Sequence, residues 1–207
     1  MATTPTKLSD EDARQARYAL ESQDAAYRGG AYDYLESLGL APRMAIMAAY
    51  IHRTEARRVL DVGCGFCDLL SYLDGAIGYI GVDISEAAIE KAKARFAGRA
   101  DAAFHVVNFR DWQPPDGTVD AVVWAGIART WTHAGRKGDF ADWLEIVDLA
   151  ERALRPGGIV IFEMVTPHWP ELERQIAGRY DYLAGCDLDC LTGSDEARRS
   201  IRVFKLR

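Results

Sequence analysis

The sequence lacks any apolar run approaching the ~20 residues that a membrane-spanning helix requires. Near its start it has Ser9, Asp10, Glu11 and Asp12, where a secretory signal would carry an apolar core. It also lacks a strong excess of either charge, because its formal net charge is only -6. Such a balance gives no broad electrostatic surface for nucleic acid. We therefore expect a cytoplasmic protein that binds neither membranes nor nucleic acid.

Cysteine is scarce, and its spacing needs an explanation. Cys64 and Cys67 form a C-x-x-C pair, and Cys186 and Cys190 form a C-x-x-x-C pair. Pairs of this kind can hold zinc or form a redox couple. However, no histidine lies close to either pair, and the first pair lies in a glycine-rich turn, where a metal would compete with another ligand. We expect four thiols in a reducing compartment and no metal.

The chain shows no internal repeat, no low-complexity tract and no linker long enough for a second domain. A length of 207 residues suits one domain with an extension, and 49% hydrophobic residues can supply its core. We expect an N-terminal helical arm or lid over residues 1–54 and the main domain over 55–207. Apolar spacing and Gly or Pro punctuation place the arm's helices at 9–27, near 32–38 and from Pro42 onward.

The most informative stretch is Val59–Asp83. An apolar run at 59–62 ends in Gly63-Cys64-Gly65, and after an amphipathic segment a second apolar run ends in Asp83. This order predicts a strand, a glycine turn, a helix, a second strand and an acidic tip. Glycines let the backbone approach a ligand closely, and a carboxylate can accept hydrogen bonds from both hydroxyls of a ribose. The stretch therefore predicts a site for an adenosine-containing ligand.

A dinucleotide fits this turn poorly. Its fingerprint, G-x-G-x-x-G, would require glycine where the chain has Asp68, and a carboxylate there would repel a pyrophosphate. Asp61, two residues before the G-x-G, instead suits a ligand that carries an amino group. S-adenosylmethionine has such a group at one end and a ribose at the other.

The residues Asp61-Val62-Gly63-Cys64-Gly65 resemble motif I of the class I S-adenosylmethionine-dependent methyltransferases. Asp83, the run Asp120-Ala121-Val122-Val123-Trp124 and the phrase Leu154-Arg155-Pro156-Gly157-Gly158 extend this resemblance from about Arg57 to Val165. One departure is Cys67, which stands where the family often has a third glycine. Because cysteine is small, we expect the turn to survive.

Strands alternate with helices after the arm, which predicts a parallel sheet covered on both faces. We expect strands at 59–62, 79–82, 103–107, 119–124 and 159–165. We expect helices at 66–73, 85–96, 140–154 and 169–176. Two last strands, at 181–191 and 200–206, should form an antiparallel hairpin. The predicted fold is α/β: a doubly wound, mostly parallel, seven-stranded Rossmann-like sheet with a C-terminal antiparallel hairpin and an N-terminal helical arm.

Ligands of such sheets bind beyond the carboxyl ends of the strands. The resemblance implies S-adenosylmethionine as cofactor and S-adenosylhomocysteine as product. Gly63 and Gly65 would bring backbone close to the methionine part. Asp61 would orient the amino group, directly or through water, and Asp83 would accept from the ribose hydroxyls.

Four further positions follow the second, third and fourth strands. We expect Ile84 to pack on the adenine face. Asn108 stands where the family often binds the adenine amino group, and Phe109 would contribute its backbone there. Ala125, with Gly126, would line the floor of the site.

No decisive catalytic motif is present, and none is required. The sulfonium is already activated, so transfer needs an in-line nucleophile, close approach and exclusion of water. Catalytic candidates are His133, a base near neutral pH or a solvated surface residue, and Tyr32, which could close over the cofactor or pack the arm. Glu163 lies in an apolar strand, so it is a paired structural acid or a site residue.

Three residues are candidates for the substrate pocket. Tyr27 lies in the arm, while Arg129 and Trp131 follow the fourth strand. Arg129 could hold a substrate carboxylate, and Trp131 could wall the pocket or attract the cation.

The leading hypothesis is a biosynthetic methyltransferase that acts on a small molecule by direct in-line transfer to an N, O, S or C nucleophile. The alternative is an enzyme of the same fold that consumes the cofactor itself, by internal cyclisation or alkyl transfer that releases methylthioadenosine. A third possibility is a protein that binds the cofactor without turnover. We expect a monomer or homodimer.

Overall fold

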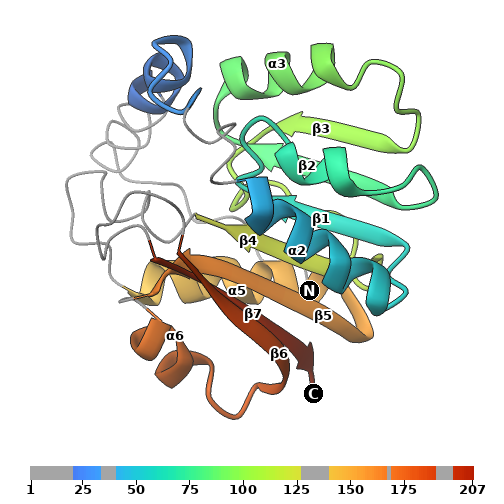
Figure 1. Cartoon of the computed structure of the whole chain (residues 1–207), viewed down its shortest axis with the longest axis vertical. Coiled ribbons are helices and arrows are strands. Elements are labelled where there is room, and N and C mark those ends of the chain that lie inside the picture. The colour runs from blue at the N-terminus through green and yellow to red at the C-terminus, as the bar shows by residue number, and fades with distance from the viewer. Residues whose placement is uncertain (1–20, 34–40, 127–139, 167–168, 190–197) are drawn as a thin grey trace, which may run out of the picture.

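The computed structural model of the chain describes residues 21–33, 41–126, 140–166, 169–189 and 198–207 (Figure 1). Its centre is a seven-stranded sheet with the order β3-β2-β1-β4-β5-β7-β6. The first five strands are parallel, and β7 is antiparallel to both β5 and β6. The strands are β1 (Arg58–Val62), β2 (Gly78–Asp83), β3 (Ala102–Val106), β4 (Val119–Ala125), β5 (Leu154–Val165), β6 (Tyr180–Asp189) and β7 (Arg198–Leu206). The predicted fold class is confirmed.

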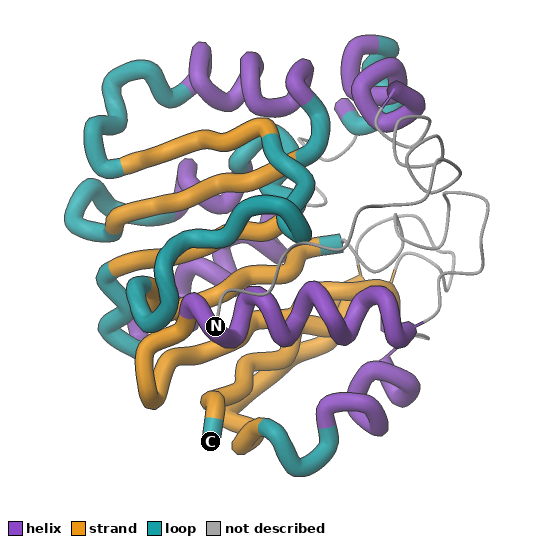
Figure 2. The backbone as a smooth tube through the Cα atoms, turned by 180° about the vertical axis from the view of Figure 1, so that it is seen from behind, coloured by secondary structure: helices purple, strands orange, loops and turns teal. Residues whose placement is uncertain are grey.

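Helices cover both faces of the sheet. On the face toward the viewer in Figure 1 lie α2 (Ala41–Arg53) and the 3-10 helix η2 (Asp68–Tyr72), and Ala92 of α3 (Glu86–Arg95) joins the same core. The opposite face, which Figure 2 shows from its own side, carries α5 (Phe140–Ala153) and α6 (Trp169–Ile176). A parallel sheet requires this double cover, because its strands are apolar on both sides.

Alternation along the strands divides the core into two clusters. In β1, Val59 belongs to the cluster under α2, whereas Leu60 and Val62 belong to the cluster under α5. In β5, Ile161 belongs to the cluster under α2 and Phe162 to the cluster under α5. Each buried aliphatic or aromatic side chain contributes about 1.5–3 kcal/mol relative to an exposed one. The sheet thereby becomes a rigid support for the loops at its carboxyl edge.

The segment after the glycine turn differs from the sequence prediction. A helix was expected over 66–73, and the structure has a shorter one there, the 3-10 helix η2 over Asp68–Tyr72. Cys67 stands at its N-cap with φ 57°, a left-handed conformation that an α-helix cannot include and that costs a non-glycine residue about 1–2 kcal/mol. Cys67 therefore adopts the backbone geometry of the glycine that it replaces, and the turn survives as expected.

Other helix and strand boundaries differ slightly from the predicted ones. β5 begins at Leu154, five residues before the predicted Ile159, because Leu154 already pairs with Val119 of β4. The helix predicted from Pro42 is α2, which begins at Ala41. Of the first predicted helix, residues 21–28 are described and helical. The division of the chain at 54/55 stays a prediction.

Candidate functional site

The glycine turn joins the carboxyl ends of β1 and β2. The backbone N–H groups of Gly63 and Cys64 donate to the carbonyl of Val82, at 2.8 and 3.1 Å. Gly63 and Gly65 have φ values of 69° and 52°, which favour glycine. A Cβ atom on Gly65 would stand 2.9 Å from the hydroxyl of Tyr27, so a side chain there would force Tyr27 to shift. The backbone of the turn therefore favours glycine, and Gly65 also allows Tyr27 its close approach.

Asp83, at the end of β2, is buried beside this turn. Its Oδ2 accepts from the N–H of Gly65 and its Oδ1 from the N–H of Ser85, both at 2.9 Å. Burial raises the pKa of Asp83, while these backbone bonds oppose the rise. A carboxylate oxygen can accept more than one hydrogen bond, so both oxygens keep acceptor capacity. Asp83 thus fits the ribose of the predicted cofactor while it holds the turn in place.

Asp61 lies on β1, and its side chain is buried. Its Oδ2 accepts a 2.6 Å hydrogen bond from the hydroxyl of Tyr79, and its buried Oδ1 has no partner among the described residues. Burial raises the pKa of Asp61 to about 7, and the bond from Tyr79 opposes the rise. A buried acceptor without a donor costs free energy. A ligand's ammonium group would remove this cost, so Asp61 fits the methionine end of the cofactor.

The three residues predicted to contact adenine differ in exposure and in their surroundings. Ile84 is half-buried directly after β2, and the exposed Asn108 accepts from the N–H of Arg110 through its side-chain oxygen at 3.1 Å. Phe109 belongs to the core, where its ring packs edge-to-face on Trp124 at 6.2 Å between centroids. The roles of Ile84, Asn108 and Phe109 toward adenine stay predictions.

An unpredicted contact fastens the arm to this site. Asp24, in the helix over 21–28, accepts hydrogen bonds from the hydroxyl of Ser85 at 2.9 Å and from the N–H of Ala87 at 2.8 Å. The bond from Ala87 lowers the pKa of Asp24. Asp24 therefore serves as a remote cap for the first turn of α3. Sequence reasoning missed it, since more than sixty residues separate the partners and no local pattern marks them.

The arm brings Tyr27 over the glycine turn. Its ring lies 4.4 Å from that of Tyr32 and 5.1 Å from that of Phe66, between centroids. Burial and the charge of Asp83 raise the pKa of Tyr27 well above its usual value, so its hydroxyl keeps its proton. The hydroxyl of Tyr32 donates to Gln23 at 2.8 Å. Tyr27 is therefore placed at the cofactor turn, whereas the hydroxyl of Tyr32 is engaged within the arm.

A second charged cluster lies farther along the same edge of the sheet. Glu163 of β5 is fully buried and accepts from two arginines: Arg43 Nη1 to Oε2 at 3.2 Å, and Arg199 Nη1 to Oε1 at 3.1 Å. Arg43 lies on α2 one and two turns from Met47 and Ile51, all three buried. Arg43 escaped the sequence analysis, although a charged residue on an otherwise apolar helical stripe is a signal that could have revealed it.

Ala125 ends β4, and Gly126 follows it beside this cluster. The N–H of Gly126 donates to the carbonyl of Glu163 at 2.9 Å. A Cβ atom on Gly126 would stand 3.6–3.9 Å from the charged ends of Arg199, Glu163 and Arg43. Glu163, predicted as either a paired acid or a site residue, is thus a paired acid at the rim of the predicted acceptor site. Its catalytic role stays a prediction.

Three of the predicted site residues, Arg129, Trp131 and His133, lie outside the described residues.

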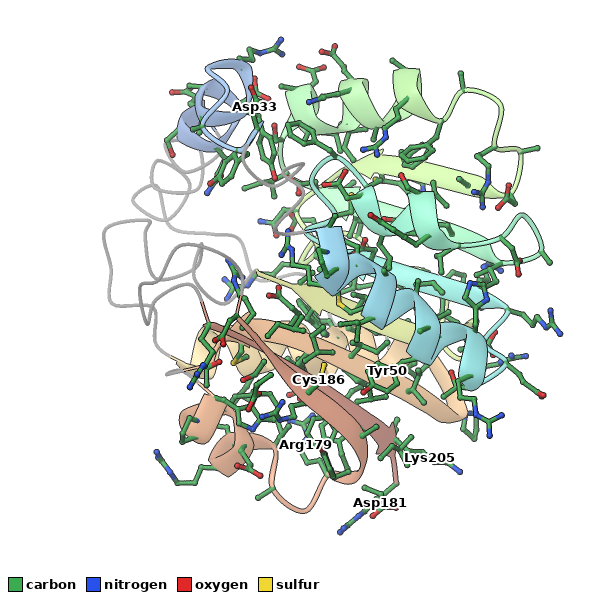
Figure 3. The ribbon with its side chains drawn as sticks, in the orientation of Figure 1. Asp33, Tyr50, Arg179, Asp181, Cys186 and Lys205 are labelled. Carbon is green, nitrogen blue, oxygen red and sulfur yellow. The ribbon has the colours of Figure 1, made fainter. Side chains whose placement is uncertain are left out.

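The thiols of Cys64 and Cys67 both lie against Gly81, whereas Cys186 lies on β6 beside Tyr50 of α2 (Figure 3). Among the described residues, no group of three or more His, Cys, Asp or Glu side chains could hold a metal ion. Within the same part of the chain, no helix has the length and apolar character needed to cross a membrane.

Comparisons with known proteins agree with this geometry. Residues 59–158 match the model of a family described as a methyltransferase domain. No curated protein matches the sequence. The fold resembles that of the N-methyltransferase NodS from Bradyrhizobium japonicum WM9, in complex with S-adenosyl-L-homocysteine, with a TM-score of 0.69 and 14% identity over 93% of this chain and 97% of that one.

Two other solved structures widen the comparison. The 1,6-didemethyltoxoflavin-N1-methyltransferase of Burkholderia thailandensis, with bound 1,6-didemethyltoxoflavin and S-adenosylhomocysteine, has a TM-score of 0.70 and 17% identity over 99% of this chain and 93% of its own. The [4+2]-cyclase SpnF has a TM-score of 0.57 and 18% identity over 79% of this chain and 80% of its own. Identities this low show the shared fold alone.

Proposed function

We propose that this chain, which matches a methyltransferase-domain model over residues 59–158, is an S-adenosylmethionine-dependent methyltransferase of the class I fold and transfers a methyl group to a small molecule by direct in-line displacement. The observation that carries this proposal is the pair of buried aspartates beside the glycine turn. Asp61 has one buried oxygen without a partner among the described residues, and Asp83 has acceptor capacity left on both oxygens. The two carboxylates stand at neighbouring strand ends, which suits the two polar ends of one nucleoside.

The chain's own residues bind and orient this ligand. Asp61 takes the amino group, with its carboxylate held in place by the hydroxyl of Tyr79. Asp83 takes the ribose hydroxyls while Gly65 and Ser85 hold its two oxygens. When bound, the cofactor supplies an activated methyl group on a sulfonium. The contribution of the protein is then alignment and exclusion of water.

The N-terminal arm contributes to the exclusion of water from the site. Asp24 ties the arm to the start of α3, and Tyr27 covers the turn at Gly65. A neutral tyrosine there shields the site without adding a charge that would compete with the bound nucleoside. Tyr27, Arg129 and Trp131 remain our proposals for contact with the acceptor, and Tyr32 and His133 remain proposals for catalysis.

A small acceptor is favoured by the similar structure that holds 1,6-didemethyltoxoflavin. The expected setting is biosynthesis in the cytoplasm, by a monomer or homodimer. Consumption of the cofactor without an acceptor is the second candidate. The likeness to the [4+2]-cyclase SpnF favours keeping this second candidate, because SpnF shows that the fold also serves reactions other than methyl transfer.

One experiment separates the candidates. The pure protein is incubated with S-adenosylmethionine, alone and with a panel of small amines, phenols and carboxylic acids, and products are identified by mass spectrometry. S-adenosylhomocysteine that forms only with an acceptor supports methyl transfer. Methylthioadenosine that forms without an acceptor supports self-consumption. Absence of both products, together with absence of binding in calorimetry, would contradict both functions.

A further inference from the structure

The thiols of Cys64 and Cys67 are a part of the glycine turn to which the proposed function gives no role. The N–H of Cys67 donates to the carbonyl of Cys64 at 2.9 Å, which closes a four-residue turn around Gly65 and Phe66. A turn closed in this way brings its first and last Cα atoms within about 7 Å, and the Cα atoms of disulfide-bonded cysteines are about 4.4–6.8 Å apart. The backbone therefore holds the two cysteines close to the spacing that a disulfide requires.

The two cysteine side chains also point to the same place. A Cβ atom on Gly81 of β2 would stand 3.0 Å from the sulfur of Cys64 and 3.1 Å from that of Cys67, so both sulfurs lie over this glycine. The thiol of Cys64 is hydrogen-bonded to that of Cys67. A glycine inside a strand often marks the close approach of another group. Gly81 therefore provides the space in which the two thiols meet.

Gly65 connects the two thiols to the proposed cofactor site. Both thiols donate to the carbonyl of Gly65, over sulfur–oxygen distances of 3.9 and 4.0 Å, while the N–H of Gly65 donates to Asp83 at 2.9 Å. A disulfide has no S–H group, and its two sulfurs are only about 2.05 Å apart. Its formation would remove both donors from the Gly65 carbonyl and draw together the side chains at the two ends of the turn. The N–H that holds Asp83 would shift with them.

We propose that Cys64 and Cys67 form a reversible disulfide with an oxidant of the low-molecular-weight disulfide class, such as oxidised glutathione, and that this disulfide weakens binding of the nucleoside cofactor. The effect on the cofactor rests on the proposed function, whereas formation of the disulfide does not. In a reducing compartment the resting form is the dithiol, which is the form that binds the cofactor. Accumulation of the oxidant then lowers the activity, and its removal restores it.

The oxidation takes place in two exchange steps. Cys64, the half-buried member of the pair, loses its proton, and its sulfur attacks one sulfur of oxidised glutathione, which forms a mixed disulfide and releases one glutathione thiolate. The deprotonated sulfur of Cys67 then attacks that of Cys64 and releases the second glutathione thiolate. The two protons pass to the released thiolates, so the two cysteines lose two electrons and oxidised glutathione gains them. Burial raises the pKa of the Cys64 thiol, which makes the first step slow, so the reaction is followed to equilibrium.

The test uses the full-length protein, equilibrated in mixtures of reduced and oxidised glutathione. Intact mass and peptide mapping identify the product, and calorimetry gives the affinity for S-adenosylhomocysteine before and after treatment with dithiothreitol. We expect the loss of two hydrogen atoms in mass, a cross-link between Cys64 and Cys67, and binding of S-adenosylhomocysteine that is about tenfold weaker or more. Dithiothreitol should restore the original mass and affinity.

The decisive variant is C67S, which keeps a small polar side chain at the turn and cannot form the disulfide. Its affinity for S-adenosylhomocysteine should be the same before and after the glutathione treatment. C186S is the matched control, since Cys186 is also half-buried but lies on β6, at the far edge of the sheet (Figure 3). It should respond like the wild type. C64S serves in place of C67S if that variant does not fold.

Two results would overturn the proposal. In one, Cys64 and Cys67 remain thiols, or each carries a separate glutathione, at equilibrium with excess oxidised glutathione. In the other, the disulfide forms but leaves the affinity for S-adenosylhomocysteine unchanged. A wild-type protein that forms the disulfide but does not bind S-adenosylhomocysteine even when reduced would contradict the proposed function while supporting the disulfide pair.

Discussion

The two halves of the sheet's carboxyl edge treat buried charge in opposite ways. At β1 and β2, Asp61 and Asp83 are buried with only neutral hydrogen-bond donors, and burial raises the pKa of each. At β5 and β7, Glu163 is buried between two arginines. In the proposed function, the first half offers acceptors to the amino and hydroxyl groups of a nucleoside. The second half neutralises its buried carboxylate with arginines of the protein itself. The contrast predicts opposite changes in stability when Asp61 or Glu163 loses its charge.

The largest effect should come from removing the central carboxylate of the second half. Glu163→Gln leaves two buried guanidinium groups without a counter-charge, and we expect the free energy of unfolding to fall by about 3–5 kcal/mol. Urea unfolding measures this loss. Glu90→Gln, an exposed position on α3, should change it by less than about 0.5 kcal/mol. A similar, small effect of both substitutions would show that the cluster is not a coupled charge unit.

The first half should respond in the opposite direction. The pKa of Asp61 is raised from 3.8 to about 7 in the folded protein, so the folded state keeps a proton that the unfolded state releases between these values. Folding stability contributed by this group is therefore present at low pH and falls as pH rises from about 4 to 7. Asp61→Asn should remove this loss and stabilise the free protein at pH 8 by up to about 4 kcal/mol, with little change at pH 4.

Thermal and urea unfolding at pH 4 and pH 8 measure this difference, and calorimetry with S-adenosylhomocysteine should show weaker binding by the stabilised variant. Asp101→Asn is the matched control, because the hydrogen bond from Arg99 lowers the pKa of Asp101, so its loss should destabilise the protein or leave it unchanged. An Asp61→Asn variant that is less stable at pH 8 would show that the carboxylate is not held at a cost.

A smaller effect is expected at Asp83. Replacement by alanine should weaken binding of S-adenosylhomocysteine by about 1.5–3 kcal/mol, the scale of a charged hydrogen-bonded contact. Isothermal titration calorimetry gives this difference, with Asp116→Ala, in the exposed turn before β4, as the control of equal charge change. Affinity that stays at the wild-type level would remove Asp83 from the ribose site.

The smallest effect concerns the arm. Asp24→Ala removes a cap from the start of α3, and we expect a loss of about 1 kcal/mol in stability with faster hydrogen exchange over residues 21–28. Asp33→Ala is the comparison, since Asp33, which Figure 3 labels, is an exposed residue of the same arm whose carboxylate approaches Lys91 of α3 at 4.0 Å. Equal exchange in the two variants would mean that Asp24 does not hold the arm.

The cofactor half was largely predictable, because its signals are local. The run from Val59 to Asp83 contains the strand, the glycine turn and the acidic tip within one short segment, and the structure has each of them. The helix predicted over 66–73 is shorter in the structure, since apolar spacing alone did not reveal the left-handed backbone at Cys67. The pairing of Glu163 was one of two alternatives that the sequence left open.

The sequence by itself determined the fold class, the positions of the first strands and the two aspartates beside the glycine turn, because residues close in sequence and the periods of strand and helix carry that information. Only the tertiary structure decided that Arg43, Glu163 and Arg199 meet, and that Asp24 caps α3. Their partners lie between 36 and 120 positions apart, so no local pattern couples them. Burial in one low-dielectric core then makes each charge depend on the others.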